Sequence, residues 1–155
     1  MGLGVGLIGS GYMGKCHALA WNNVTSVFGD VERPRLVTLA EVNPELASKK
    51  AAEFGFARST GNWRDLLSDP EIDVIISTGG TGLTGRDVTP EALDRVKTKD
   101  IPGFGELFRW LSFSSIGTST IQSRACAVLA GGTYIFALPG SNGAVKDGWD
   151  QILVH

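Results

Sequence analysis

Two glycine-rich loops constrain the fold of this chain more than any other feature of its sequence. The first loop, residues 9–14, follows an apolar run at residues 3–8, and the second, residues 79–85, follows an apolar run at residues 72–77. Short continuous apolar runs are typical of strands that are buried on both faces of a parallel sheet. A glycine loop after such a strand predicts a tight turn into a helix, so the two loops together indicate an α/β protein.

Strands and helices are expected to alternate along the rest of the chain. Asn43-Pro44-Glu45 predicts a helix start, because Asn caps helices, Pro suits the first helical position and an acid suits the first turn. Gly55 predicts the end of that helix, and Thr89-Pro90-Glu91 predicts another start of the same kind. The other predicted strands span residues 36–42, 56–60, 125–129 and 133–138, and the other predicted helices span residues 12–22, 62–67, 102–111 and 145–153, with a loop at residues 24–34.

The overall architecture follows from this alternation. Gly131-Gly132 separates two predicted strands and indicates a hairpin, in which one strand runs antiparallel to the others. The predicted fold class is therefore α/β: a three-layer α/β/α sandwich with a Rossmann-like, mainly parallel sheet and one antiparallel strand near the C-terminus. Because no linker is visible, we expect a single domain over residues 1–155, built from two half-domains, residues 1–76 and 77–155, that share one sheet.

Composition and charge exclude several classes of protein. With 43% hydrophobic and 19% charged residues, the chain is expected to fold rather than to stay disordered. Its net charge of −2 argues against a general nucleic-acid surface, and no apolar run has the length of a membrane span. Cys16 and Cys126 lack metal or redox spacing, so we expect buried thiols in a reducing compartment and a cytoplasmic location.

The first loop has the spacing G-x-G-x-x-G between a strand and a helix, which is the context that dinucleotide binding requires. Gly9 allows the tight turn, Gly11 lets a pyrophosphate approach the backbone, and Gly14 lets the helix pack closely. The helix N-terminus offers free N–H groups to the anion, and Glu41 at the end of the next strand could hold the ribose hydroxyls. A glycine turn that binds nothing, with Glu41 a solvated acid, is the alternative. The predicted dinucleotide-binding residues are Gly9, Ser10, Gly11, Tyr12, Met13, Gly14 and Glu41.

Residues 5–75 resemble the start of a Gfo/Idh/MocA-type NAD(P)-dependent oxidoreductase through three ordered segments, residues 6–18, 40–45 and 62–74. The resemblance implies a dinucleotide-binding half-domain with NAD or NADP as cofactor. Glu41 favours NAD, because an acid at this position repels a 2′-phosphate. His17 is not the catalytic residue of that family and is expected to serve packing. The chain departs from the family before its Thr-Pro-Asn turn, its Glu-Lys-Pro motif with the catalytic lysine, and its substrate-binding domain.

The second loop, Thr78-Gly79-Gly80-Thr81-Gly82, also follows a predicted strand. The backbone N–H groups of such a loop can form an anion site, to which Thr81 would add a hydroxyl. Asp87 could hold a metal ion or orient a ligand amine, and Arg86 could face a phosphate or simply be solvated. Judged from its residues alone, the loop fits a purely structural turn equally well.

Residues 77–153 resemble the later half of the MoaB/MogA family of molybdenum cofactor biosynthesis proteins through four ordered motifs, at residues 78–92, 102–106, 123–125 and 138–141. The resemblance implies a pocket for molybdopterin or a nucleotide phosphate. Its implied lining residues are Gly79, Gly80, Thr81, Gly82, Asp87, Glu91, Ser123, Pro139, Gly140 and Ser141. Capping or surface pairing is an alternative role for Ser123, Glu106 and Arg124. The family's Ser-Asp-Arg stretch and Asp-x-Ser-Gly motif are replaced here by the first glycine loop. Members of the family are trimers or hexamers, so the resemblance allows a homo-oligomer.

These observations together predict an engineered or recombined chimera, a folded scaffold without native catalysis, for which weak NAD(P) or nucleotide binding and the absence of any ligand are the two alternatives. We accordingly predict no catalytic and no metal-binding residues, and a dinucleotide or a pterin phosphate as the ligand. Two alternatives stay open: a molybdopterin- or nucleotide-binding protein of molybdenum cofactor biosynthesis, and a fragment of an NAD(P)-dependent oxidoreductase. Residual adenylyltransferase activity, dependent on Asp87 and Mg²⁺, is a weaker third hypothesis.

Overall fold

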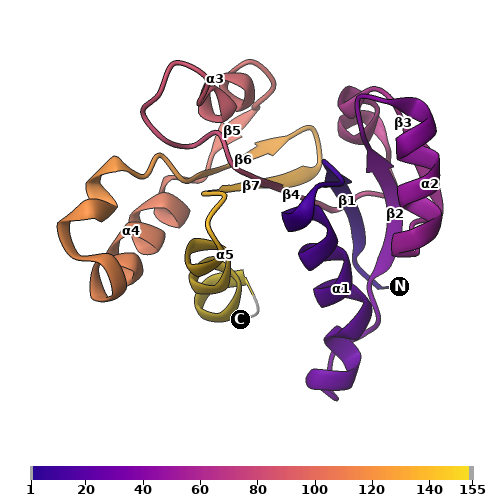
Figure 1. The fold of residues 1–155 in the computed structure, drawn as a ribbon, viewed down its shortest axis with the longest axis horizontal. Helices are drawn as coiled ribbons and strands as arrows, with labels where there is room; N and C mark the ends of the chain where they lie inside the picture. Colours follow the sequence, from indigo (N-terminus) through magenta and orange to yellow (C-terminus); the bar gives the residue numbers. More distant parts are fainter. Residues whose placement is uncertain (1, 154–155) are drawn as a thin grey trace. The chain divides into compact units, whose positions relative to one another are not determined.

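The computed structural model describes residues 2–153, apart from the side chains of Trp149 and Asp150. The chain divides into two compact units: the first comprises Met1–Ile76 and Gly131–Thr133, and the second comprises Ser77–Ala130 and Tyr134–His155. Strands alternate with helices in both units (Figure 1). The sheet is mainly parallel with an antiparallel part near the C-terminus, which confirms the predicted α/β class.

The first unit contains a parallel sheet in the order β3-β2-β1-β4. β1 (Gly4–Ile8) lies between β2 (Arg35–Ala40) and β4 (Val74–Thr78), and β3 (Arg58–Thr60) forms the edge. The connections contain α1 (Tyr12–Val27), α2 (Pro44–Phe54) and a 3₁₀ helix, η1 (Trp63–Ser68). Because β1 and β2 run parallel, the loops that follow them lie at the same edge of the sheet.

Local signals determine the ends of α2 but not the end of α1. Asn43 caps α2 by accepting a hydrogen bond from the Leu46 N–H at 3.0 Å, and Gly55 ends the helix at φ 83°, as predicted. α1 continues to Val27, so the prediction that it ends at residue 22 was wrong. Residues 15–28 contain neither glycine nor proline, and hence nothing in the backbone stops the helix earlier.

The core of the first unit packs α1 and α2 against β1 and β2. Its buried cluster consists of Leu7, Ala18, Leu39, Ala47, Ala51, Phe54 and Phe56. Leu66 of η1 is also fully buried and lies over Gly6 of β1, where a Cβ would come within 2.9 Å of its side chain. His17 is buried, in agreement with the predicted packing role, and this burial lowers its pKa.

The other strands follow the order β7-β6-β5. Gly131, at φ 65°, and Gly132 connect β6 (Cys126–Ala130) to β7 (Thr133–Leu138), so these neighbouring strands form the predicted hairpin. β5 (Lys99–Asp100) pairs antiparallel with β6, which makes β6 the antiparallel strand. The sequence does not predict β5, because two residues are too few for a recognisable pattern.

The helices of the second unit are α3 (Thr89–Asp94), α4 (Pro102–Ile116) and α5 (Asn142–Gly148), with a 3₁₀ helix, η2 (Gly117–Gln122), after α4 and a π-helical turn, η3 (Trp149–Leu153), after α5. α4 runs past its predicted end at residue 111, and the last helix begins before its predicted start at residue 145. Phe104 and Phe108 anchor α4 in the core, where the ring centroid of Phe104 lies 5.1 Å from that of Phe136 in β7.

Candidate ligand-binding sites

The first glycine loop has the backbone that its motif predicts. Gly9 adopts φ 91°, in the left-handed region that favours glycine. A Cβ on Gly14 would lie 2.2 Å from the Gly9 carbonyl oxygen, whereas a Cβ on Gly11 would have no atom within 4 Å. Gly11 is the N-cap of α1 and gives it no side-chain cap. The start of α1 therefore presents backbone N–H groups beside an open space, which suits a pyrophosphate.

Glu41 holds the same loop through Ser10. One carboxylate oxygen, Oε2, accepts hydrogen bonds from the Ser10 N–H at 3.0 Å and from the Ser10 hydroxyl at 2.6 Å. The other oxygen, Oε1, accepts one from the Val42 N–H at 2.9 Å. The Ser10 hydroxyl, more than any other contact, lowers the pKa of Glu41. The acid predicted to hold ribose hydroxyls therefore lies next to the glycine loop, directly after β2, but is already bonded to a hydroxyl of the protein.

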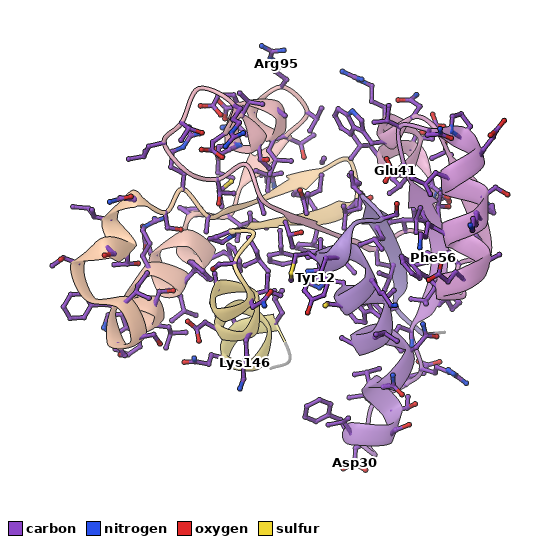
Figure 2. The ribbon with its side chains drawn as sticks, in the orientation of Figure 1. Tyr12, Asp30, Glu41, Phe56, Arg95 and Lys146 are labelled. Atoms are coloured by element: carbon purple, nitrogen blue, oxygen red, sulfur yellow. The ribbon has the colours of Figure 1, made fainter. Side chains whose placement is uncertain are left out.

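A small cavity of about 100 Å³ adjoins this carboxylate. Its lining residues are Ile8, Gly9, Ala40, Glu41, Val42, Gly61 and Trp63. Trp63 was not predicted as a site residue, and the Arg64 guanidinium lies 4.5 Å from its ring centroid. Tyr12, at the start of α1, is 72% exposed and points away from the core of the unit (Figure 2). Pockets for drug-sized ligands are roughly 300–1,000 Å³, so only part of a dinucleotide would fit this cavity.

The second glycine loop is held by other backbone segments of its own unit. Gly79 and Gly80 adopt φ 93° and 68°. The Gly79 N–H donates to the Leu138 carbonyl at 2.8 Å, and the Thr89 hydroxyl donates to the Gly79 carbonyl at 2.9 Å. The sequence motif predicted that Thr89 caps α3. In the structure its hydroxyl bonds to the glycine loop instead, and α3 has no side-chain cap. A Cβ on Gly140 would lie 3.3 Å from the Gly79 Cα, and a Cβ on Gly80 would lie 2.3 Å from the Thr89 hydroxyl oxygen, so Gly140 and Gly80 each permit a close approach to this loop.

Arg124 also holds the second glycine loop in place through hydrogen bonds. Its backbone N–H donates to the Thr81 carbonyl and its Nε to the Gly82 carbonyl at 2.8 Å. The remaining guanidinium nitrogens donate to the Asp87 carbonyl and to the Glu91 carboxylate, and the Arg124 contact lowers the pKa of Glu91. Glu91, placed in the pocket by the family resemblance, therefore pairs with an arginine and does not line the cavity described below.

Asp87 also serves the loop itself. Its Oδ2 accepts hydrogen bonds from the Thr84 N–H at 2.9 Å and from the Thr84 hydroxyl at 2.5 Å. The Thr84 hydroxyl is the main cause of the lowered pKa of Asp87. Among the residues that the structure describes, no group of three or more His, Cys, Asp or Glu side chains could hold a metal ion. Asp87 thus closes a tight turn with Thr84.

A cavity of about 360 Å³ lies in the second unit, within the size range of small-molecule pockets. Five residues implied by the family resemblance line it: Thr81, Gly82, Ser123, Pro139 and Ser141. The other lining residues come from α4, η2 and α5, and the sequence did not single them out: Phe108, Ser112, Ser115, Ile116, Gln122, Gly143, Ala144 and Asp147. The lining is rich in hydroxyl groups, and among the lining residues that the structure describes Asp147 is the one that carries a charge.

Three further predictions concern cysteines and membranes. Cys16 and Cys126 are free thiols, as predicted, but both are only half-buried. Burial nevertheless raises the pKa of the Cys126 thiol. Within residues 2–153, no helix is both long and apolar enough to cross a membrane.

Comparison with known proteins gives relatives for both parts of the chain. Molybdenum cofactor biosynthesis protein B of Escherichia coli (strain K12) is 49% identical over 87 residues, which are 56% of this chain and 51% of that protein. A crystal structure of molybdenum cofactor biosynthesis protein B covers 99% of this chain and 90% of its own, with 26% identity and a TM-score of 0.66. A levoglucosan dehydrogenase in complex with NADH is 44% identical over 49% of this chain and 21% of its own, with a TM-score of 0.48.

The chain spans about half the length of the curated relatives it matches. Residues 3–99 match the family described as an oxidoreductase family with an NAD-binding Rossmann fold, and residues 64–155 match the family described as a probable molybdopterin binding domain. The two matches overlap at residues 64–99. Each covers more than half of the chain, and the chain therefore belongs to both families, as the two resemblances of its halves predicted.

Proposed function

We propose that the chain is a recombined or engineered joining of two half-domains, residues 1–76 and 77–155, whose remaining function is to bind a phosphorylated pterin in the second-unit cavity. The boundary between the two units, after Ile76, falls inside the overlap of the two family matches, which supports a join at that point. Catalysis is not part of the proposal, because the described lining residues of this cavity include one acid and no second charged group.

The observation that carries this proposal is that residues from three separate loops meet in one cavity of suitable size. Thr81 follows β4, Ser123 follows η2, and Ser141 follows β7. The hydroxyl oxygens of Ser123 and Ser141 accept hydrogen bonds from the Ala125 and Ala144 N–H groups, each at 3.3 Å, so their protons stay free to donate. Three hydroxyl donors in the lining of one cavity suit a phosphate group.

Titration calorimetry with 6-hydroxymethylpterin phosphate tests the proposal. Thr81→Val keeps the shape of the buried side chain but removes its hydroxyl, and we expect it to weaken binding about tenfold. Thr118→Val, at an exposed position of η2, is the matched control and should bind like the original chain. If the well-folded protein gives no binding heat with this ligand, the proposed function is wrong.

We propose NAD binding at the first glycine loop as a second, weaker function. The open space at Gly11 beside the uncapped start of α1 favours it. Gly11→Val should abolish NAD⁺ binding without unfolding the protein, because a side chain there meets only the space that a pyrophosphate would take. NADP⁺ should bind less well than NAD⁺ because of Glu41. A heat of NAD⁺ binding that survives Gly11→Val would place the dinucleotide elsewhere.

A further inference from the structure

We propose that Asn142, the first residue of α5, is a site of spontaneous deamidation, and that the carboxylate formed there weakens phosphate binding in the second-unit cavity. The reaction needs water and no enzyme. Deamidation of Asn142 is independent of the proposed function, whereas its effect on binding rests on that function. The capacity of the cavity to bind a phosphorylated ligand would then decline with the age of the protein.

The residue that follows Asn142 distinguishes it from the other asparagines of the chain. Deamidation begins when the backbone nitrogen of the next residue attacks the side-chain amide carbon, and a side chain on that next residue hinders the attack. Asn142 is followed by Gly143, which has none. The other four asparagines are followed by residues with side chains, and one of these is Pro44, which has no N–H group. Asn142 is therefore the asparagine at which the sequence most favours ring closure.

The side chains of the other asparagines are also held by hydrogen bonds. Two of them donate to backbone carbonyls and two accept from backbone N–H groups: Asn22 and Asn23, and Asn43 and Asn62. A bonded amide must leave its partner before its carbon can be attacked, which slows the reaction. At the start of α5 the bonds instead involve neighbours of Asn142, because the Ser141 hydroxyl accepts from the Ala144 N–H at 3.3 Å and the Ser141 carbonyl from the Val145 N–H at 3.0 Å.

The attacking nitrogen is accessible in the fold. Asn142 and Gly143 are both exposed, and Gly143 is the second residue of α5, where a backbone N–H group has no acceptor within the helix. α5 has seven residues, and the ends of helices fray, so its first turn can open to the more extended backbone that ring closure needs. A Cβ on Gly143 would have no atom within 4 Å. Alanine therefore fits at this position, which provides a variant that hinders the reaction without disturbing the packing.

The reaction balances with water as its co-reactant. The Gly143 nitrogen loses its proton and bonds to Cγ of Asn142, and the side-chain amide nitrogen leaves as ammonia. Water then opens the resulting succinimide ring at either of its carbonyls, which leaves aspartate or isoaspartate at position 142. In both products a neutral amide has been replaced by a carboxylate.

The new charge would lie beside the hydroxyl groups of the cavity. Ser141 and Gly143, on either side of Asn142, both line the cavity, and so does Thr81. Like charges that are brought close together repel each other, so the carboxylate opposes an anionic phosphate at these hydroxyls. The isoaspartate product also adds the side-chain carbon to the backbone path next to Ser141, which shifts its hydroxyl. Both products are therefore expected to weaken phosphate binding.

Peptide mass spectrometry of the full chain tests the modification. Trypsin releases residues 125–146 as a peptide in which Asn142 is the sole asparagine or glutamine, and residues 59–64 as a peptide that contains Asn62. At mildly alkaline pH we expect Asn142 to deamidate within days, about tenfold faster than Asn62. Gly143→Ala should slow deamidation of Asn142 by about the same factor. Equal rates at the two asparagines, or an unchanged rate in Gly143→Ala, would overturn the proposed modification.

Calorimetry with 6-hydroxymethylpterin phosphate tests the effect on binding. The incubated chain and Asn142→Asp should both bind about tenfold more weakly than the fresh chain. Asn142→Gln is the control, because its longer side chain closes a ring far more slowly, and its affinity should be the same before and after incubation. Unchanged affinity after complete deamidation would overturn the effect on binding and leave the proposed function standing. If the fresh chain does not bind, the proposed function and the effect on binding fail together, while the peptide masses still decide whether Asn142 is modified.

Discussion

The two glycine loops of this molecule begin alike and end differently. Each follows a buried strand, and each places its first glycine near φ 90°, Gly9 at 91° and Gly79 at 93°. The first loop leads directly into α1 and leaves an open space at Gly11. The second is tied down by Thr89 and Arg124, and its far end, at Thr81 and Gly82, lines a much larger cavity. A glycine motif thus specifies the turn, while the segments that meet around it decide what the turn can hold.

The acids near the two loops show the same contrast. Glu41 bonds to Ser10 and adjoins a cavity of about 100 Å³. Asp87 and Glu91 bond to Thr84 and Arg124 and are not among the lining residues of the larger cavity, which include the carboxylate of Asp147. In both units, the acids near a glycine loop therefore bond to groups of the protein itself, Glu41 to Ser10 and Asp87 to Thr84. The differences between the loops lead to four predictions, given from the largest expected effect to the smallest.

The largest effect is expected from an added methyl group at Gly14. A Cβ there would lie 2.2 Å from the Gly9 carbonyl oxygen, so helix and loop must separate. Gly14→Ala should lower the free energy of unfolding by about 3 kcal/mol, even though alanine is the better helix former. Urea denaturation followed by circular dichroism measures this. Gly11→Ala is the matched control and should change stability by less than about 0.5 kcal/mol. Equal losses of unfolding free energy in both variants would show that stability does not depend on the close approach of Gly14 to the Gly9 carbonyl.

Removal of the Arg124 side chain tests whether the order of the second glycine loop depends on the hydrogen bonds that this side chain donates. Arg124→Ala removes the hydrogen bonds to the Gly82 and Asp87 carbonyls, and Gly82 lines the cavity. Because a loop that must be ordered before binding reduces affinity, we expect about tenfold weaker binding of the phosphorylated pterin. Faster amide exchange in residues 80–88 should accompany it. Arg95→Ala, at an exposed arginine after α3, should change neither quantity (Figure 2). Unchanged exchange would mean that the Thr89 hydroxyl and the backbone hydrogen bonds of the loop hold it without the Arg124 side chain.

Features of the structure that depend on neighbouring residues could be predicted from the sequence, whereas features that depend on contacts between distant residues could not. Asn43 and Gly55 mark the ends of α2 because a cap acts within one turn of the helix. Thr81 and Ser141 were assigned to the pocket because they lie in motifs of a known family, and both line the cavity. Ser112 and Asp147 were missed because they lie in two separate helices and carry no motif. Their approach depends on the packing of α4 against α5, which no local pattern encodes.

A smaller effect is expected from Ser10, and it goes in the favourable direction. Ser10→Ala removes the hydroxyl that bonds to Glu41 at 2.6 Å and leaves a carboxylate oxygen ready for the ribose hydroxyls of NAD. The loss of this competing bond should raise the affinity for NAD⁺ about threefold, as measured by calorimetry. Ser59→Ala, at an exposed position of β3, should leave the affinity unchanged. Weaker binding in the Ser10 variant would mean that the serine itself contacts the cofactor.

The smallest effect concerns pH and the Glu41 carboxylate. Hydrogen bonds from Ser10 lower its pKa below the usual 4.5, so the folded protein favours the charged form. Its contribution to stability is therefore complete above the unfolded pKa and is lost as the pH falls through the folded pKa. Glu41→Gln should be less stable than the original chain at pH 7, and this difference should shrink from about pH 5 to about pH 3. Urea midpoints across this range measure it, with Asp30→Asn as an exposed control. A difference that stays constant with pH would mean that the shape of the Glu41 side chain, rather than its charge, holds the first loop.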